Sequence, residues 1–212
     1  MQSEPTAKFD GRFSDPGADP TPWPEVERVL EEAELYWVTT VRVDGRPHVT
    51  PLIGLFHDGA MHFTTGLEEQ KARNLEHSAR VVLTTGKNLW KKGMDVVVEG
   101  TAVRVTDREG LQQLADAIEA KYGGDWHFDV GTDVFEHGDG GVAAVFRVEP
   151  DKVMAFAKEP HAQTAFRFGS SASEVFGSQP SRRGRRGLCG TLSPWLTTTS
   201  VRGGLRSMSS TR

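Results

Sequence analysis

Cysteine is almost absent from this sequence, since Cys189 is the single one among 212 residues. A lone cysteine excludes an internal disulfide and a cysteine-based metal site. No apolar run approaches the roughly 20 residues that span a bilayer. The polar stretch 1–19 also lacks the apolar segment typical of a secretory signal. We therefore expect a cytoplasmic protein without a membrane segment.

Several familiar catalytic motifs are missing as well. The seven histidines are scattered, without HExxH or Cys/His spacing, so no metal site is predicted. The sequence has no Gly-x-Gly-x-x-Gly, no P-loop and no Gly-x-Ser-x-Gly. A Rossmann site and a nucleotide triphosphatase are therefore unsupported, and no catalytic residue is identified.

The charge of the chain is uneven along its length. The net charge is −4, but from Gly169 onward seven arginines face one acid, which leaves +6 there and −10 on the rest. An acidic body argues against nucleic acid as the main partner.

Composition divides the chain into three zones. Residues 1–20 are rich in Pro, Gly and Asp and are predicted to be a flexible arm. Residues 21–168 show sustained hydrophobic periodicity and are expected to form the folded domain. Residues 169–212, rich in Ser, Gly, Arg and Thr, are predicted to be a disordered basic tail. A frameshift would produce the same abrupt change in composition.

The folded zone reads as short strands with helices between them. A helix is predicted from Pro22, and alternating strands follow with hairpin turns at Asp44-Gly45 and Asp58-Gly59. Capping boxes at 65–68 and 106–109 predict two further helices. More strands are expected at 81–83, 94–105 with a bulge at Gly100, 142–148, and in broken form at 152–157 and 165–168. Hairpin-length turns demand antiparallel pairing, so we predict a mostly β (α+β) fold, an antiparallel barrel with peripheral helices.

One segment has the composition of an anion site. Thr64 and Thr65 end a strand, a capped helix is expected to start there, and Lys71 follows within two turns. Free N–H groups at a helix start, two hydroxyls and a cation suit a phosphate. An ordinary surface helix with a solvated Lys71 would show the same pattern.

A second segment is a strand with two prolines, Pro47 and Pro51. Each proline removes a ladder donor, which indicates an edge, a bulge or a place where a ligand meets the backbone. A planar ring could lie against this strand, and a plain edge strand protected by proline is the alternative. Trp90 stands among Lys87, Lys91 and Lys92 in what reads as either an anion-binding rim or a solvated loop.

Taken together, these stretches resemble the pyridoxamine 5′-phosphate oxidase-like split-barrel superfamily over about residues 23–168. The resemblance is carried by the order and spacing of several segments. They are Trp37–Pro51, Phe63–Gly66, Lys71–Leu75, Asp95–Gly100 and Gln163–Phe168.

The resemblance implies an antiparallel split β-barrel homodimer with two cofactor sites at the subunit interface. A flavin or deazaflavin ring would lie beside the proline strand, and the phosphate would bind at the following strand end and helix lysine. The predicted cofactor-binding residues are Pro47, His48, Val49, Thr50, Pro51, Leu52, Thr64, Thr65, Lys71, Asn74 and Trp90.

Two departures from the family pattern narrow the expected activity. The arginine-rich closing motif of vitamin B6 oxidases is missing, and Ala165 stands where F420-dependent relatives usually have arginine. The leading hypothesis is an F420-dependent reductase that passes a hydride to a small unsaturated or carbonyl-type molecule, with His48 as the nearest candidate proton donor. An FMN-binding oxidoreductase and a non-catalytic flavin- or haem-binding protein are the alternatives.

Overall fold

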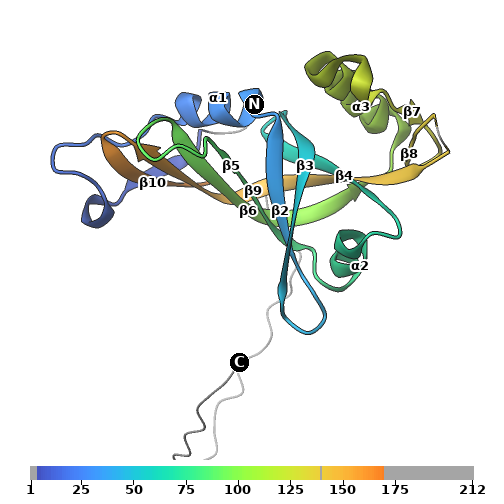
Figure 1. The fold of residues 1–212 in the computed structure, drawn as a ribbon, viewed down its shortest axis with the longest axis horizontal. Helices are drawn as coiled ribbons and strands as arrows, with labels where there is room; N and C mark the ends of the chain where they lie inside the picture. Colours follow the sequence, from blue (N-terminus) through green and yellow to red (C-terminus); the bar gives the residue numbers. More distant parts are fainter. Residues whose placement is uncertain (1–3, 139, 170–212) are drawn as a thin grey trace, which may run out of the picture. The chain divides into compact units, whose positions relative to one another are not determined.

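Strands dominate the computed structural model, which describes residues 4–138 and 140–169 (Figure 1). The strands are β1 (Thr6–Phe9), β2 (Leu35–Val41), β3 (Pro47–His57), β4 (Ala60–Gly66), β5 (Arg80–Gly86), β6 (Met94–Val105), β7 (Asp129–Val130), β8 (Phe135–Glu136), β9 (Val142–Lys158) and β10 (His161–Arg167). The helices are α1 (Trp23–Glu32), α2 (Gln70–His77) and α3 (Arg108–Tyr122), with short 3-10 turns η1 (Gly11–Phe13) and η2 (Gly123–Trp126).

Six of these strands close into a barrel. Their order is β9-β4-β3-β2-β5-β6, every pairing is antiparallel, and β6 pairs back onto β9 to complete the ring. The predicted mostly β fold with peripheral helices is thereby confirmed. The hairpin at Asp58-Gly59 forms as expected, because both residues take the positive φ angles (48° and 67°) that a tight hairpin turn requires.

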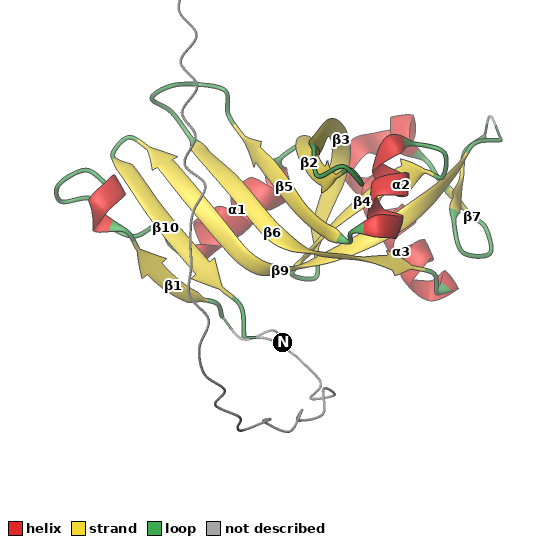
Figure 2. Ribbon diagram, turned by 90° about the horizontal axis from the view of Figure 1, so that it is seen from below, coloured by secondary structure: helices red, strands yellow, loops and turns green. Residues whose placement is uncertain are grey.

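The longest strand, β9, is where the sheet splits. One edge pairs with β6, while the other pairs with β4 as far as Val148 and with β10 from Lys152. Figure 2 shows β10 and β1 continuing the sheet beside this end of β9. Pro150 lies in the gap between these two partner strands and pairs with Gly100 of β6, where the register shifts because β9 has one extra residue, Asp151. A proline is tolerated at such an irregular position, where one side of the strand has no partner within the described ranges. The predicted break between a strand at 142–148 and one at 152–157 is therefore wrong. The irregularity predicted at Gly100 is present, but its extra residue is in β9 rather than in the 94–105 strand.

Two hydrophobic clusters stabilise the barrel, one inside it and one on its outer surface. The interior cluster includes Tyr36, Phe63 and Phe166, and α1 adds Trp23, Val26 and Leu30. The outer cluster lies between the wall and α3, whose Leu111, Leu114, Ala115 and Ile118 pack near Leu55 and Val145. Alternation along the strands explains this division, because Leu55 and Phe56 point to opposite faces.

The ends of α1 and α3 follow local capping chemistry closely, with one shift at the start of α3. α1 begins at Trp23 after Pro22, as predicted. α3 begins one residue later than its capping box suggests, because the Asp107 carboxylate rather than Thr106 accepts the Gly110 N–H at 2.7 Å. α3 ends at Tyr122 as expected, before Gly123 with a φ of 70°.

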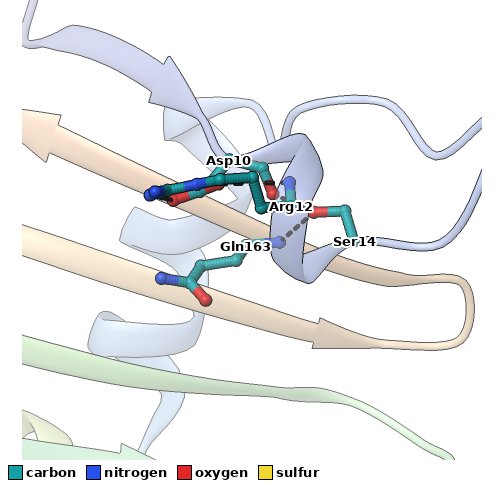
Figure 3. Close-up of polar contacts among 4 residues, drawn as sticks. All are labelled: Asp10, Arg12, Ser14 and Gln163. Atoms are coloured by element: carbon teal, nitrogen blue, oxygen red, sulfur yellow. Dashed lines mark hydrogen bonds and ion pairs between the residues drawn. The ribbon is translucent and has the colours of Figure 1, made fainter.

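Part of the predicted arm over residues 1–20 is regular structure instead. β1 pairs with β10, and Asp10 continues this attachment by donating its N–H to the Gln163 carbonyl at 2.9 Å. Ser14 Oγ accepts the Gln163 N–H at 3.0 Å, while Arg12 pairs with the Asp10 carboxylate (Figure 3). The polar, glycine-containing sequence of residues 1–20 gives no local signal for this strand, because its partner β10 lies about 150 residues away in the chain.

The predicted tail at 169–212 lies outside the described residues apart from Gly169. None of the helices within the described ranges is long and apolar enough to cross a membrane. Within the same ranges, no group of three or more His, Cys, Asp and Glu side chains is placed to hold a metal ion.

Candidate functional site

The first half of β3 forms an edge of the sheet. Residues 47–53 pair with β2, but pairing with β4 begins only at Gly54. The second edge of residues 47–53 therefore has no strand partner among the described residues. The two prolines of this stretch are tolerated for that reason, and the edge interpretation drawn from them is correct.

Two buried polar atoms without hydrogen-bond partners lie on the inward side of this half-strand. They are His48 Nδ1 and Thr50 Oγ1, two residues apart on the same face of β3. Buried polar groups are nearly always paired, so two neighbouring exceptions mark a place that a polar ligand or water would complete. Both residues belong to the predicted cofactor strand.

Burial lowers the pKa of His48, and the nearby cations Arg42 and Lys71 lower it further. The neutral imidazole is therefore the favoured form near pH 7. A neutral ring suits hydrogen bonding better than delivery of a proton, so the geometry does not strengthen His48 as a proton donor.

Lys71 is buried at the start of α2 and already has an anionic partner. Its ammonium group pairs with the Glu69 carboxylate, with the Lys71 side chain 6% and the Glu69 side chain 50% exposed. Glu69 also accepts the Gly66 N–H at 2.8 Å. The predicted anion site therefore contains a carboxylate of the chain itself, a residue that the sequence reasoning missed although it stands two positions before the lysine.

Asn74 fixes α2 against the β2–β3 hairpin rather than facing open space. Its amide donates to Thr40 Oγ1 at 2.8 Å, and both side chains are fully buried. Thr40 lies directly opposite His48 in the β2–β3 pairing. This bond places the Lys71 end of α2 beside His48, and Figure 1 shows α2 next to the lower part of the hairpin. Asn74 thus has a positioning contact that a sequence motif alone cannot distinguish from ligand binding.

The two threonines at the end of β4 point to opposite faces. Thr65 is buried and contacts the Glu69 and Gly66 group, whereas Thr64 lines a small pocket with Ile53, Gly54 and Tyr122. Thr65 is also not the N-cap of α2. Its strand continues to Gly66 through pairing with β9, and α2 starts at Gln70 after Glu69. The predicted capping box at 65–68 is wrong for this reason.

The outward face of the same half-strand is apolar and exposed. Pro47, Val49 and Pro51 lie here, and Trp37 stands directly opposite Pro51 in β2. Val49 is 54% and Trp37 42% exposed. Leu52, by contrast, alternates inward and packs against the barrel interior. The predicted ring-binding residues are therefore divided between an inward polar side and an outward apolar side.

Trp90 lies apart from the other predicted residues within one chain. It is 89% exposed in the loop between β5 and β6. Antiparallel pairing puts this loop at the Leu35 end of β2, whereas His48 pairs near the Val41 end, so about 20 Å of strand separates them. The structure brings together His48, Thr65, Lys71 and Asn74, but not Trp90.

The sequence profile of the family described as pyridoxamine 5′-phosphate oxidase matches residues 22–156, which include every predicted site residue. No curated protein matches this chain in sequence.

Solved structures share the fold at low identity. A conserved hypothetical protein from Mycobacterium tuberculosis is 18% identical, with coverage of 72% of this chain and 91% of its own and a TM-score of 0.57. A heme binding protein from Mycobacterium smegmatis is 15% identical, with coverage of 69% and 58% and a TM-score of 0.52. An F420 reductase is 22% identical, with coverage of 60% and 94% and a TM-score of 0.46. The first two structures, with TM-scores above 0.5, share the fold of this chain, and identities this low do not identify its cofactor.

Proposed function

The chain belongs to the pyridoxamine 5′-phosphate oxidase family, and on that premise we propose that it is an oxidoreductase that binds a phosphate-bearing flavin-type cofactor along the free edge of β3. The cofactor we propose is the deazaflavin F420, with FMN as the alternative. The substrate is a small unsaturated or carbonyl-type molecule. When bound, the reduced deazaflavin supplies the hydride for this reaction.

The observation that carries the proposal is the pair of unpartnered atoms on β3. His48 Nδ1 and Thr50 Oγ1 are buried, face the same side and lie on a strand edge whose backbone has no second partner in the described chain. A heteroaromatic ring with carbonyl and N–H groups supplies the hydrogen bonds that these atoms lack. The residues present therefore fit the ring of a flavin-type cofactor.

The phosphate group of such a cofactor fits the hydrogen-bond donors around Lys71. The Gly66 N–H and the Lys71 ammonium converge on the Glu69 carboxylate, and both could equally donate to a phosphate. The Thr65 hydroxyl lies beside them, donates to the Gly66 carbonyl at 3.1 Å and helps to lower the pKa of Glu69. Thr64 lies on the other face of β4 and is not part of this arrangement. We accordingly propose Thr65 and Lys71, without Thr64, as phosphate ligands.

A second copy of the chain is part of the proposal. The outward apolar face at Trp37, Val49 and Pro51 is exposed in one chain, and burying such a face is the usual function of a homodimer interface. A ring on the β3 edge would otherwise leave one side open to water, which disfavours hydride transfer. The partner's loop around Trp90 is proposed to cover it, because Trp90 is too far from His48 to do so within its own chain.

The test is a titration of the full-length protein with F420, FMN and haem separately, followed by ring fluorescence or Soret absorbance. Haem is included because a protein of the same fold from Mycobacterium smegmatis binds it. Saturable binding of F420 with an affinity at least roughly tenfold above that of FMN supports the reductase, and the reverse order supports the alternative. Binding of haem alone would contradict the proposed function.

A further inference from the structure

The Glu69 carboxylate is bound by groups of the predicted anion site. It accepts the Gly66 N–H at 2.8 Å, pairs with the buried Lys71 ammonium and lies within reach of the Thr65 hydroxyl. Burial on its own raises the pKa of Glu69, but hydrogen bonds from Lys71, Gly66 and Thr65 bring that pKa below its ordinary value. Glu69 is therefore ionised near pH 7, and its charge is held by donors from the end of β4 and the start of α2.

The two partners of this ion pair differ in their freedom to move. The Lys71 side chain is 6% exposed, whereas half of the Glu69 side chain is in contact with solvent. Glu69 also stands just before α2, so its side chain is not held within a helical turn. A rotation about its side-chain bonds would carry the carboxylate into water while the lysine and the N–H group stayed in place.

We propose that Glu69 is a competing internal ligand, which holds the anion site of this chain until a phosphate group displaces it. This inference rests on the proposed function, because the displacing group there is the phosphate of the cofactor. Glu69 satisfies the buried lysine in the absence of ligand, since an unpaired buried ammonium would be costly. Entry of the phosphate then releases the carboxylate, so the site discriminates against ligands whose anionic group is too weak to displace Glu69.

Glu68 provides a matched comparison within the same segment. Its side chain is 94% exposed and pairs with Arg73, an exposed cation on α2. Glu68→Gln removes the same charge one residue away without touching Lys71 or Gly66. If removing any negative charge from this segment raised the affinity for phosphate, Glu68→Gln would show the increase as well. If only the Glu69 carboxylate competes with phosphate, Glu68→Gln would leave the affinity unchanged.

The experiment measures the affinities of the full-length protein and its E69Q and E68Q variants for two ligand pairs. One pair is FMN with riboflavin, and the other is F420 with its phosphate-free deazaflavin chromophore. Two like charges a few ångströms apart repel strongly outside bulk water, so E69Q should bind the phosphorylated member roughly 10-fold or more tightly than the unmodified chain. Riboflavin and the phosphate-free chromophore should bind all three proteins equally, and E68Q should match the unmodified chain.

Inorganic phosphate separates this inference from the proposed function. By calorimetric titration it should bind E69Q more tightly than the unmodified chain, and it should lose this gain in the double variant E69Q/K71M. If no protein binds either cofactor, the proposed function fails, and the phosphate titration alone decides the role of Glu69. Equal or weaker phosphate binding by E69Q would overturn the inference, as would equal or weaker binding of the phosphorylated cofactor.

Discussion

At the scale of single residues, Thr50 is the clearest case of a side chain arranged for a ligand rather than for the fold. Its buried hydroxyl has no partner among the described residues. Thr50→Val removes that hydroxyl with almost no change in shape, so we expect the free energy of unfolding to rise by roughly 1 kcal/mol. Cofactor binding should weaken by about 2- to 12-fold, because one hydrogen bond to the ring is lost. Thermal denaturation and fluorescence titration check the two effects, and a loss of stability with unchanged affinity would contradict the assignment.

The buried His62 predicts how the free energy of unfolding depends on pH, independently of any cofactor. Burial on β4, together with the positive charge of the neighbouring Arg147, lowers the pKa of His62 from 6.5 to about 4. The unfolded chain therefore takes up a proton between pH 6.5 and 4 while the folded chain does not, so stability is lost as the pH falls through this window. The loss attributable to His62 is about 3 kcal/mol.

The measurement compares urea denaturation at pH 7 and pH 4.5 for the unmodified chain, His62→Gln and His77→Gln. His77 is an exposed histidine at the end of α2 and serves as the control. His62→Gln should flatten the pH dependence, and His77→Gln should leave it as it is. A slope that survives in His62→Gln would show that other groups cause it.

At the scale of elements, the contact between β6 and β9 depends on one glycine. A Cβ at Gly100 would lie 2.5 Å from the Glu149 carbonyl oxygen and 2.7 Å from Val148 Cγ1. Gly100→Ala should therefore lower the free energy of unfolding by roughly 1–3 kcal/mol through overpacking. Gly124→Ala is the matched control, since nothing lies within 4 Å of its added Cβ. Equal melting temperatures for the two variants would contradict the close contact at the split.

The elements that sequence predicted well are those with local causes. The turn at Asp58-Gly59 and the C-terminal end of α3 follow from residues within a few positions of one another. The errors at Thr65 and Pro150 have a distant cause. Thr65 looks like a helix cap but pairs with Ala144 of β9, and Pro150 looks like a strand break but lies in a gap between two partner strands. Tertiary pairing overrides both local signals.

The sequence predicted the candidate site only in part, for the same reason. The sequence pointed to the proline strand and the lysine as a candidate site, because their order and spacing resemble those of the family. It could not show that Thr64 and Thr65 face opposite ways, that Asn74 is engaged by Thr40, or that Glu69 already holds Lys71. Each of these facts depends on which face of a strand or helix meets a neighbour, and spacing alone does not fix that.

For the molecule as a whole, we expect a homodimer formed through the outward face of β2 and β3. Trp37→Lys places a charge on the exposed apolar face opposite Pro51 and should shift the protein toward monomer at micromolar concentration. Val103→Lys is the control. It places the same charge on an exposed valine of a different strand, β6, where the side chain is 62% exposed. Light scattering measures both, and a Trp37→Lys variant that remains dimeric would place the interface elsewhere.

Lys71→Ala is the decisive test of whether a phosphate-bearing cofactor binds beside β3 and α2. Arg73→Ala removes an exposed cation from the same helix and is the control. The measurement is the dissociation constant for F420 and for FMN, with thermal denaturation alongside it. Loss of a charge-assisted hydrogen bond predicts an affinity about 10- to 150-fold lower for Lys71→Ala and unchanged for Arg73→Ala, with both variants folded. A folded Lys71→Ala variant that binds the cofactor as tightly as the unmodified chain would contradict the account.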